Sequence, residues 1–253
     1  MTDAKNPIKS TETTFRILDE LAAQQSATVT SLSEDLDLSK GTIHNHLSTL
    51  RGLGYLVKED NEYRLGVRFL RLGTIGRERF EVYRVSTEIL ANLAQTTGEC
   101  ACLVAREETR GTYLNTVVGE HTPQVTIRPG DAADLLRSAG GKAILAHCTR
   151  DEIAEIYDRE GAADGAESTL DELREELREI RQRSLSFSRA EHIDGRYGVG
   201  APIKTPDGAV RCAVAIVGPE ERLSGKVLQQ DFAGLASSAA KDIERAMITT
   251  DGR

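Results

Sequence analysis

Hydrophobic and polar positions in the first 70 residues follow the spacing of three short helices and then of a small hairpin. Residues 11–24 repeat apolar side chains at helical spacing, which predicts a first helix with one buried stripe. That stripe is formed by Phe15, Leu18, Leu21 and Ala22. Residues 30–36 predict a second helix, in which Thr30 offers a capping hydroxyl.

A third helix is predicted to begin after the N-cap Ser39, to run to about residue 51 and to end at Gly52 and Gly54. At about 100° per residue, its apolar side chains Ile43, Leu47 and Leu50 share one face. The opposite face is small and neutral, and the basic or imidazole side chains lie at its margins. The neutral face holds Gly41, Thr42, Asn45, Ser48 and Thr49, and the margins hold Lys40, His44 and Arg51.

Two short strands, residues 55–57 and 63–65, flank a polar turn and predict a wing after the third helix. Residues 73–97 then predict one continuous linker helix, because apolar side chains recur with a 3.6-residue period. This organisation predicts a DNA-binding domain over residues 1–70, a linker helix over residues 71–97 and a second domain over residues 98–253.

The second domain alternates segments typical of strands and of helices. Most neighbouring strands lack a crossover helix between them, so the pattern indicates an α+β domain with an antiparallel sheet. Strands are predicted at 100–105, 112–118, 124–128, 199–203 and 210–217, and helices at 138–147, 151–159, 170–183 and 224–248.

The composition narrows the class of protein. The 253 residues carry 32 basic and 40 acidic side chains, for a net charge of −8, and they contain no apolar run of membrane-spanning length. Without a signal-peptide pattern, a cytoplasmic protein with no membrane partner is expected. Cys100 and Cys102 have no metal-binding spacing and are expected on one strand face as small hydrophobes. No cofactor and no metal ion are predicted.

The acidity argues at first against nucleic acid, since a DNA-binding domain usually has a basic surface. The basic residues are 24 Arg and only 8 Lys. This bias fits either a high-salt cytosol, in which negative charge preserves solubility, or a GC-rich genome. The net charge is −2 even within residues 1–70, so DNA binding must depend on shape and hydrogen bonding rather than on a basic field.

The third helix has the properties of a helix that enters the major groove. Asn45 can pair with adenine through two hydrogen bonds, and Ser and Thr hydroxyls serve bases or phosphates. His44 and His46 lie about 200° apart on this helix, so one metal ion cannot bind both. His46 borders the apolar face and is expected to pack there.

Several segments in the same order resemble the isocitrate-lyase-regulator (IclR) family of transcription factors. They are residues 27–55, Tyr63-Arg-Leu-Gly66, Leu93-Ala-Gln-Thr-Thr-Gly-Glu99, Ser138-Ala-Gly-Gly-Lys-Ala-Ile-Leu-Ala146, Glu191 with Gly195, Ala201-Pro-Ile203 and Gly218-Pro219. The resemblance implies a winged helix-turn-helix, a linker helix and a GAF/PAS-like effector-binding domain. It also implies a homodimer, often paired into a dimer of dimers, that binds a pseudo-palindromic DNA operator and controls carbon-source catabolism. With the acidic, arginine-rich composition, a halophilic archaeal source is expected.

The segment from Ser138 to Ala143 is the second candidate site. Two glycines at a helix start can expose backbone amides to an anion, or they can simply form a tight turn with Lys142 in solvent; the residues alone leave both open. It is not a Walker loop, because Leu136 and Ala143 replace the required Gly and Ser/Thr. The resemblance favours contact with an effector.

This chain departs from the family pattern at the expected cavity and on the reading helix. Gly198, Ala215 and Val217 stand where polar or thiol side chains are frequent in the family, and the acidic residue expected to line the pocket near Ser188 is absent. The cavity is therefore expected to be roomier and more apolar, and to suit a sugar derivative or an aromatic acid. Asn45 stands where Arg is frequent, which predicts a different operator preference.

Two sets of residues follow as candidates. The DNA-binding set is Thr30, Ser39, Lys40, Gly41, Thr42, His44, Asn45, Ser48, Thr49, Lys58 and Arg64. The effector-binding set is Arg128, Ser138, Ala139, Gly140, Gly141, Lys142, Glu191, Gly198, Ala215 and Val217.

Two other classes of function fit the sequence less well than a regulator does. No hydrolase, metalloprotease or dinucleotide motif is present, and Glu191-His192-Ile-Asp194 is expected to be a polar turn near the cavity mouth, so no catalytic residue and no enzyme are predicted. A small-molecule sensor or interaction module without regulated DNA binding is the alternative, and it leaves the third helix unexplained.

Overall fold

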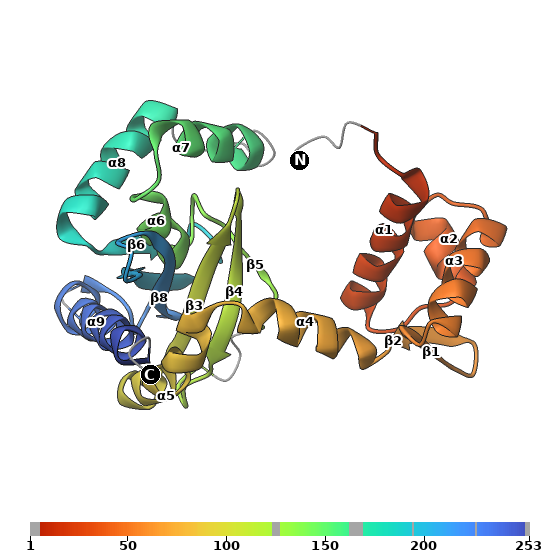
Figure 1. The fold of residues 1–253 in the computed structure, drawn as a ribbon, viewed down its shortest axis with the longest axis horizontal. Helices are drawn as coiled ribbons and strands as arrows, with labels where there is room; N and C mark the ends of the chain where they lie inside the picture. The colour runs from red at the N-terminus through yellow and green to blue at the C-terminus, as the bar shows by residue number, and fades with distance from the viewer. Residues whose placement is uncertain (1–5, 123–126, 162–168, 194, 226, 251–253) are drawn as a thin grey trace. The chain divides into compact units, whose positions relative to one another are not determined.

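The computed structural model describes residues 6–122, 127–161, 169–193, 195–225 and 227–250. Within it the chain divides into two compact units, residues 1–76 and 77–253 (Figure 1). The division falls inside the segment that the sequence predicted as a linker.

The first unit is a three-helix core with a two-stranded wing. Its helices are α1 (Lys9–Gln24), α2 (Val29–Asp35) and α3 (Lys40–Gly52), and its strands are β1 (Leu56–Glu59) and β2 (Glu62–Leu65). The strands pair antiparallel, with Leu56 opposite Leu65 and Glu59 opposite Glu62. The predicted helix-turn-helix and wing are therefore confirmed.

Two details of this unit were predicted wrongly. Phe15 and Ala22 are exposed, Phe15 to 59%, because Ile17 takes the buried place on α1 beside Leu18 and Leu21. The N-cap of α2 is Thr28 rather than Thr30: the Thr28 hydroxyl accepts from the Ser31 amide, and the Ser31 hydroxyl accepts from the Thr28 amide. This reciprocal pair closes the helix end two residues earlier.

The predicted linker helix is two helices, α4 (Arg68–Glu78) and α5 (Glu81–Thr97). The break has no Gly or Pro. Phe80, with extended backbone at φ −85° and ψ 105°, is the N-cap of α5 and packs against the core of the second unit. The whole of α5 belongs to that unit, since Val82, Leu90 and Leu93 are buried in the same core.

The second unit is a six-stranded antiparallel sheet in the order β5-β4-β3-β8-β7-β6. Its strands are β3 (Cys100–Glu107), β4 (Arg110–Val117), β5 (Ala132–Ala133), β6 (Ser186–Arg189), β7 (Arg196–Lys204) and β8 (Val210–Pro219). The antiparallel α+β class is confirmed. The predicted strand 124–128 falls largely outside the described residues, and Ile127 and Arg128 form no strand. The sequence did not predict β5 and β6.

Helices cover both faces of this sheet (Figure 1). One face packs against α5 and α9 (Ala233–Thr250), which is preceded by the π-helix η2 (Val227–Phe232). The other face packs against α6 (Ala139–Leu145), and α7 (Arg150–Ile156) and α8 (Leu170–Arg183) share a core with α6. The π-helix η1 (Tyr157–Gly161) continues α7.

Because successive side chains in a strand point to opposite faces, β3 contributes to both cores. Ala101, Leu103 and Ala105 face α5 and α9, whereas Cys100, Cys102 and Val104 belong to the core against α6. The two thiols are fully buried with sulfurs 3.6 Å apart, and hydrogen bonding to Cys100 together with burial raises the pKa of Cys102. They act as small core side chains, as predicted.

Candidate DNA-binding face and effector cavity

The helix α3 is held by its apolar face and by its cap. Ile43 and Leu47 are fully buried, Leu50 is buried, and the Ser39 hydroxyl accepts from the Thr42 amide at 3.1 Å. The helix contains Lys40 and Arg51 and no acidic residue. The first unit therefore exposes one helix without carboxylates, α3, whereas its other helices carry acidic side chains.

The predicted reading residues lie mostly on the exposed side of α3. Within the described part of the chain, the Asn45 and Ser48 side chains make no hydrogen bond, so both are free for a ligand. The Thr49 hydroxyl donates to the Asn45 carbonyl at 2.8 Å, and the Thr42 hydroxyl contacts Ser39 at 2.9 Å. Exposed on the helix or its cap are Ser39, Lys40, Gly41, His44, Asn45, Ser48 and Thr49, while Thr42 is half-buried.

The three remaining candidates lie outside α3. Lys58 of the wing stands over the Tyr63 ring at 5.3 Å from its centroid. Arg64 lies between two carboxylates, at 3.6 Å from Glu59 and 3.7 Å from Glu62, with half of its side chain exposed. Thr30 is an exposed residue inside α2 rather than its cap.

The histidines of α3 have different environments. His46 is half-buried and its Nδ1 lies 2.8 Å from the Thr14 hydroxyl, which anchors α3 to α1. His44 is exposed. In the described ranges, no group of three or more His, Cys, Asp or Glu is placed to hold a metal ion.

A small cavity lies in the second unit beside the start of α6. Six predicted residues line it: Ser138, Ala139, Gly140, Gly198, Ala215 and Val217. Six further residues were not predicted as ligands: Tyr113, Ser188, His192, Ile193, Arg196 and Tyr197. The α6 start, the strands β4 and β6 to β8 and the 190–193 turn thus meet at one place.

Aromatic rings and one guanidinium group also line this cavity. Tyr113 and His192 stack with centroids 6.3 Å apart. Burial lowers the pKa of His192 and raises that of Tyr113, so both rings are neutral at pH 7. Arg196 supplies a cation. The free volume of the cavity is about 20 Å³. That it is roomier and more apolar than is usual in the family stays a prediction.

Four predicted effector residues do not line the cavity. The Lys142 side chain is only 2% exposed, and its ammonium lies 2.9 Å from Glu176 and 2.5 Å from Glu191. The buried Lys142 ammonium therefore links α6 to α8 and to the 190–193 turn through ion pairs, and it does not face solvent. Arg128 lies in an exposed turn, where its amide donates to Asp131 at 2.7 Å. The Gly141 amide donates to the Ser138 hydroxyl at 3.0 Å.

The glycines of this site have a packing role that the sequence did not reveal. A Cβ on Gly140 would lie 2.6 Å from Val104 Cγ2, and one on Gly141 would lie 2.3 Å from the Asp134 carbonyl. On β7, a Cβ on Gly200 would lie 2.4 Å from the Ala139 carbonyl. Only glycine allows α6 to lie this close to the sheet and to the preceding turn.

The 191–194 segment is a turn at the cavity wall, as predicted for its described residues. Glu191 accepts from the Arg189 amide and from Lys142, and His192 and Ile193 line the cavity. Asp194 lies outside the described residues. The sequence signal for His192 was present, but only the fold shows that it faces Tyr113.

Both units match known protein families. Residues 10–60 match the family described as IclR helix-turn-helix domain, and residues 77–245 match the one described as Bacterial transcriptional regulator IclR C-terminal. A probable HTH-type transcriptional regulator ArcR of Halobacterium salinarum is 30% identical over 94% of this chain and 93% of its own length. The regulator KdgR of Escherichia coli is 26% identical over 90% and 88%.

Solved structures share the fold. The Thermotoga maritima IclR structure has a TM-score of 0.75 and 24% identity, and covers 94% of this chain and 98% of its own. An IclR homologue of Microbacterium hydrocarbonoxydans, solved with 4-hydroxybenzoate, has a TM-score of 0.78 and 19% identity, and covers 93% and 98%.

A winged helix-turn-helix followed by a ligand-sensing α/β unit defines a DNA-binding transcription regulator with an effector domain. This chain belongs to the IclR family of such regulators.

Proposed function

We propose that this chain is a cytoplasmic, homodimeric regulator that reads a pseudo-palindromic operator with α3 and responds to a small organic acid bound beside α6. The single observation that carries the proposal is the exposed, carboxylate-free face of α3 on a buried apolar anchor. A solvent-exposed helix that binds nothing usually carries more charged side chains than this face of α3 does. We further propose that the chain is not an enzyme and that dimers pair into tetramers.

Base readout is assigned to the neutral side chains of α3. Asn45 and Ser48 are exposed and free of internal hydrogen bonds in the described chain, so their donors and acceptors are available to base edges. Lys40, Lys58 and Arg64 would contact phosphates, which position the protein without specifying sequence. Arg64 must exchange Glu59 and Glu62 for phosphate, so its contribution is smaller than that of a free arginine.

The dimer interface is assigned to the exposed apolar side chains in and beside α4. None of the residues of α4, all of which the structure describes, is buried. Val67 is 90% exposed and Leu70 is 70% exposed, with Leu72 and Ile75 above half. Several large apolar side chains exposed on one short segment favour an association site there, and a two-fold dimer matches two operator half-sites.

The effector is assigned to the cavity beside α6. Its lining supplies one guanidinium, neutral aromatic rings and hydroxyls from Ser138 and Ser188, which suits a carboxylate on an aromatic or hydroxylated body. The related Microbacterium structure contains such an acid, 4-hydroxybenzoate. Since the free volume is about 20 Å³, binding requires the cavity to enlarge.

Fluorescence anisotropy with the DNA upstream of the protein's own coding sequence tests the reading of α3. Asn45→Ala is expected to remove about 1–3 kcal/mol of discrimination at one base pair. Arg64→Ala is expected to weaken binding to all sequences alike and to lower the salt slope by about one. Binding should also tolerate high salt, because few phosphate contacts involve free cations.

Three outcomes are informative. Absence of sequence-specific binding at both low and high salt overturns the operator proposal and leaves a sensor or interaction module. An unchanged footprint and affinity in Asn45→Ala removes this residue from the reading set. Sedimentation of Leu70→Asp tests the dimer: the variant is expected to be monomeric and folded, and an unchanged dimer would place the interface elsewhere.

A further inference from the structure

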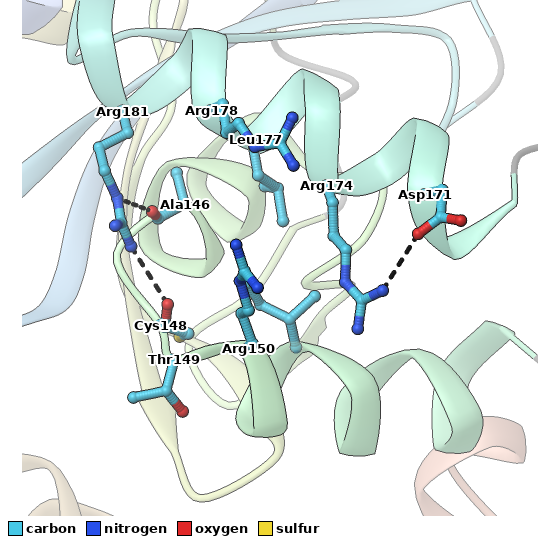
Figure 2. Close-up of a pocket in the computed structure, with 10 residues that line it drawn as sticks. Ala146, Cys148, Thr149, Arg150, Asp171, Arg174, Leu177, Arg178 and Arg181 are labelled. Carbon is cyan, nitrogen blue, oxygen red and sulfur yellow. Dashed lines mark hydrogen bonds and ion pairs between the residues drawn. The ribbon is translucent and has the colours of Figure 1, made fainter.

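A second and larger cleft lies between α7 and α8 of the second unit, which is called the effector unit from here on. It is separate from the cavity beside the start of α6. Its volume is about 460 Å³. Its apolar lining consists of Ala146, Cys148, Ile153 and Leu177, and its charged lining includes Arg150, Arg174, Arg178 and Arg181. In Figure 2, Arg150 extends from α7 toward α8, and Arg174 and Leu177 extend from α8 toward α7.

The cleft concentrates positive charge in an acidic protein. Four of the 24 arginines line one cleft, against the single carboxylate of Asp171, while the whole chain has a net charge of −8. The cleft therefore has a local excess of positive charge, which an anion would complement.

Three of the guanidinium groups have unused or weakly used donors. Arg150 has no hydrogen bond or ion pair within the described part of the chain. The Nε of Arg174 is buried without a partner, although its Nη1 lies 3.1 Å from Asp171, whose side chain is 92% exposed. Arg178 pairs with Glu175, and both are more than half exposed. Exposed pairs of this kind are weak, so an anion can replace them at little cost.

The fourth arginine has a different role. Arg181 donates to the Ala146 carbonyl at 2.6 Å and to the Cys148 carbonyl at 3.1 Å, so it fixes the end of α6 against α8. Its charge nevertheless remains in the cleft wall and is offset by no carboxylate among the described ion pairs.

We propose that the cleft between α7 and α8 is a second ligand site, for a compact organic anion that carries two or more negative charges. A phosphomonoester or a polycarboxylate has this chemistry. The planar guanidinium fork of Arg150 and of Arg174 matches both groups through paired hydrogen bonds, and Ile153 and Leu177 contact the carbon skeleton. The cleft shares no lining residue with the cavity beside α6.

Titration calorimetry on the full-length protein at constant ionic strength tests the site, with glycerol 3-phosphate, glucose 6-phosphate and citrate as probes. Saturable binding of at least one probe, one per chain, is expected. The phosphate probes and citrate distinguish the two sources of charge. Arg150→Ala and Arg174→Ala should each weaken the bound probe by about tenfold, as expected for the loss of a charge-assisted hydrogen bond.

Arg183→Ala is the matched control. Arg183 lies on α8 like Arg174 and pairs with Glu179 on the same helix, but it does not line the cleft. Its removal changes the net charge equally and should leave binding unchanged. Circular dichroism and urea unfolding establish that each variant is folded. Failure of all three probes to saturate, or an equal loss of affinity in Arg183→Ala, would overturn the proposal.

Discussion

The close approach of α6 to β7 gives a quantitative prediction for Gly200→Ala. A Cβ on Gly200 would lie 2.4 Å from the Ala139 carbonyl oxygen, 2.6 Å from its carbon and 2.8 Å from the Ser186 hydroxyl. Ordinary contact begins at 3.4 Å, so α6 must move by about 1 Å. Two of the three atoms are backbone, so a side-chain rotation alone cannot relieve the contact.

The expected loss of stability follows from two contributions. Overpacking of a core typically costs about 1–3 kcal/mol. The same displacement disturbs the hydrogen bond of 2.5 Å that the Ser186 hydroxyl donates to the Ala139 carbonyl, which is worth about 0.5–1.5 kcal/mol. Gly200→Ala should therefore lower the free energy of unfolding of the effector unit by about 3 kcal/mol.

Urea unfolding followed by circular dichroism measures this change, and Gly234→Ala is its control. Gly234 lies in α9 of the same unit, and no atom lies within 4 Å of a Cβ placed there. The control should gain up to about 1 kcal/mol, because alanine is the better helix former. A free energy within 0.5 kcal/mol of the parent protein in Gly200→Ala would refute the packing argument.

Three further predictions concern buried charge and helix capping. Burial, and then repulsion from Asp134, raises the pKa of Glu160 to about 7, so the folded chain retains a proton that the unfolded chain releases above about pH 4.5. Stability should fall by about 1–2 kcal/mol as pH rises from 4.5 to 7, after allowance for partial exposure, and Glu160→Gln should flatten this decline in urea midpoints; equal slopes would contradict it. Lys142→Met should cost about 1–3 kcal/mol in the same assay, because Glu176 and Glu191 lose their cation but can be rehydrated. Ser39→Ala should destabilise the first unit by about 1 kcal/mol in thermal unfolding, and no change would show that the cap of α3 is dispensable.

Elements with a strong local pattern were predictable from the sequence. The helix α3 was predicted with its cap Ser39 and its buried side chains, because periodicity and capping both act within a few residues. The predicted helix 170–183 coincides with α8 for the same reason. The cap of α2 was misplaced because Thr28 and Thr30 offer similar hydroxyls, and only the partner Ser31 distinguishes them.

Features that depend on tertiary packing were not predictable. The break between α4 and α5 occurs at Phe80, where burial in the second unit overrides helix propensity, while Gly73 and Gly76 remain inside α4. Lys142 was expected to reach solvent or a ligand, yet its two carboxylates come from positions 34 and 49 residues away. Tyr113, Arg196 and Tyr197 become neighbours of Ser138 only when the strand order is known.

The strand order has a further consequence for how copies of this chain meet. Within the described residues, the sheet ends on one side at β5, with two residues, and on the other at β6, with four. The longest strands, β7 and β8, are interior, and β8 is paired on both sides over residues 212–217, with β3 and with β7. Each rim strand by itself offers only a short template for strand addition. We therefore expect copies of the second unit to associate mainly through side-chain surfaces, so that mutations of exposed side chains, rather than of strand backbone, would control their assembly.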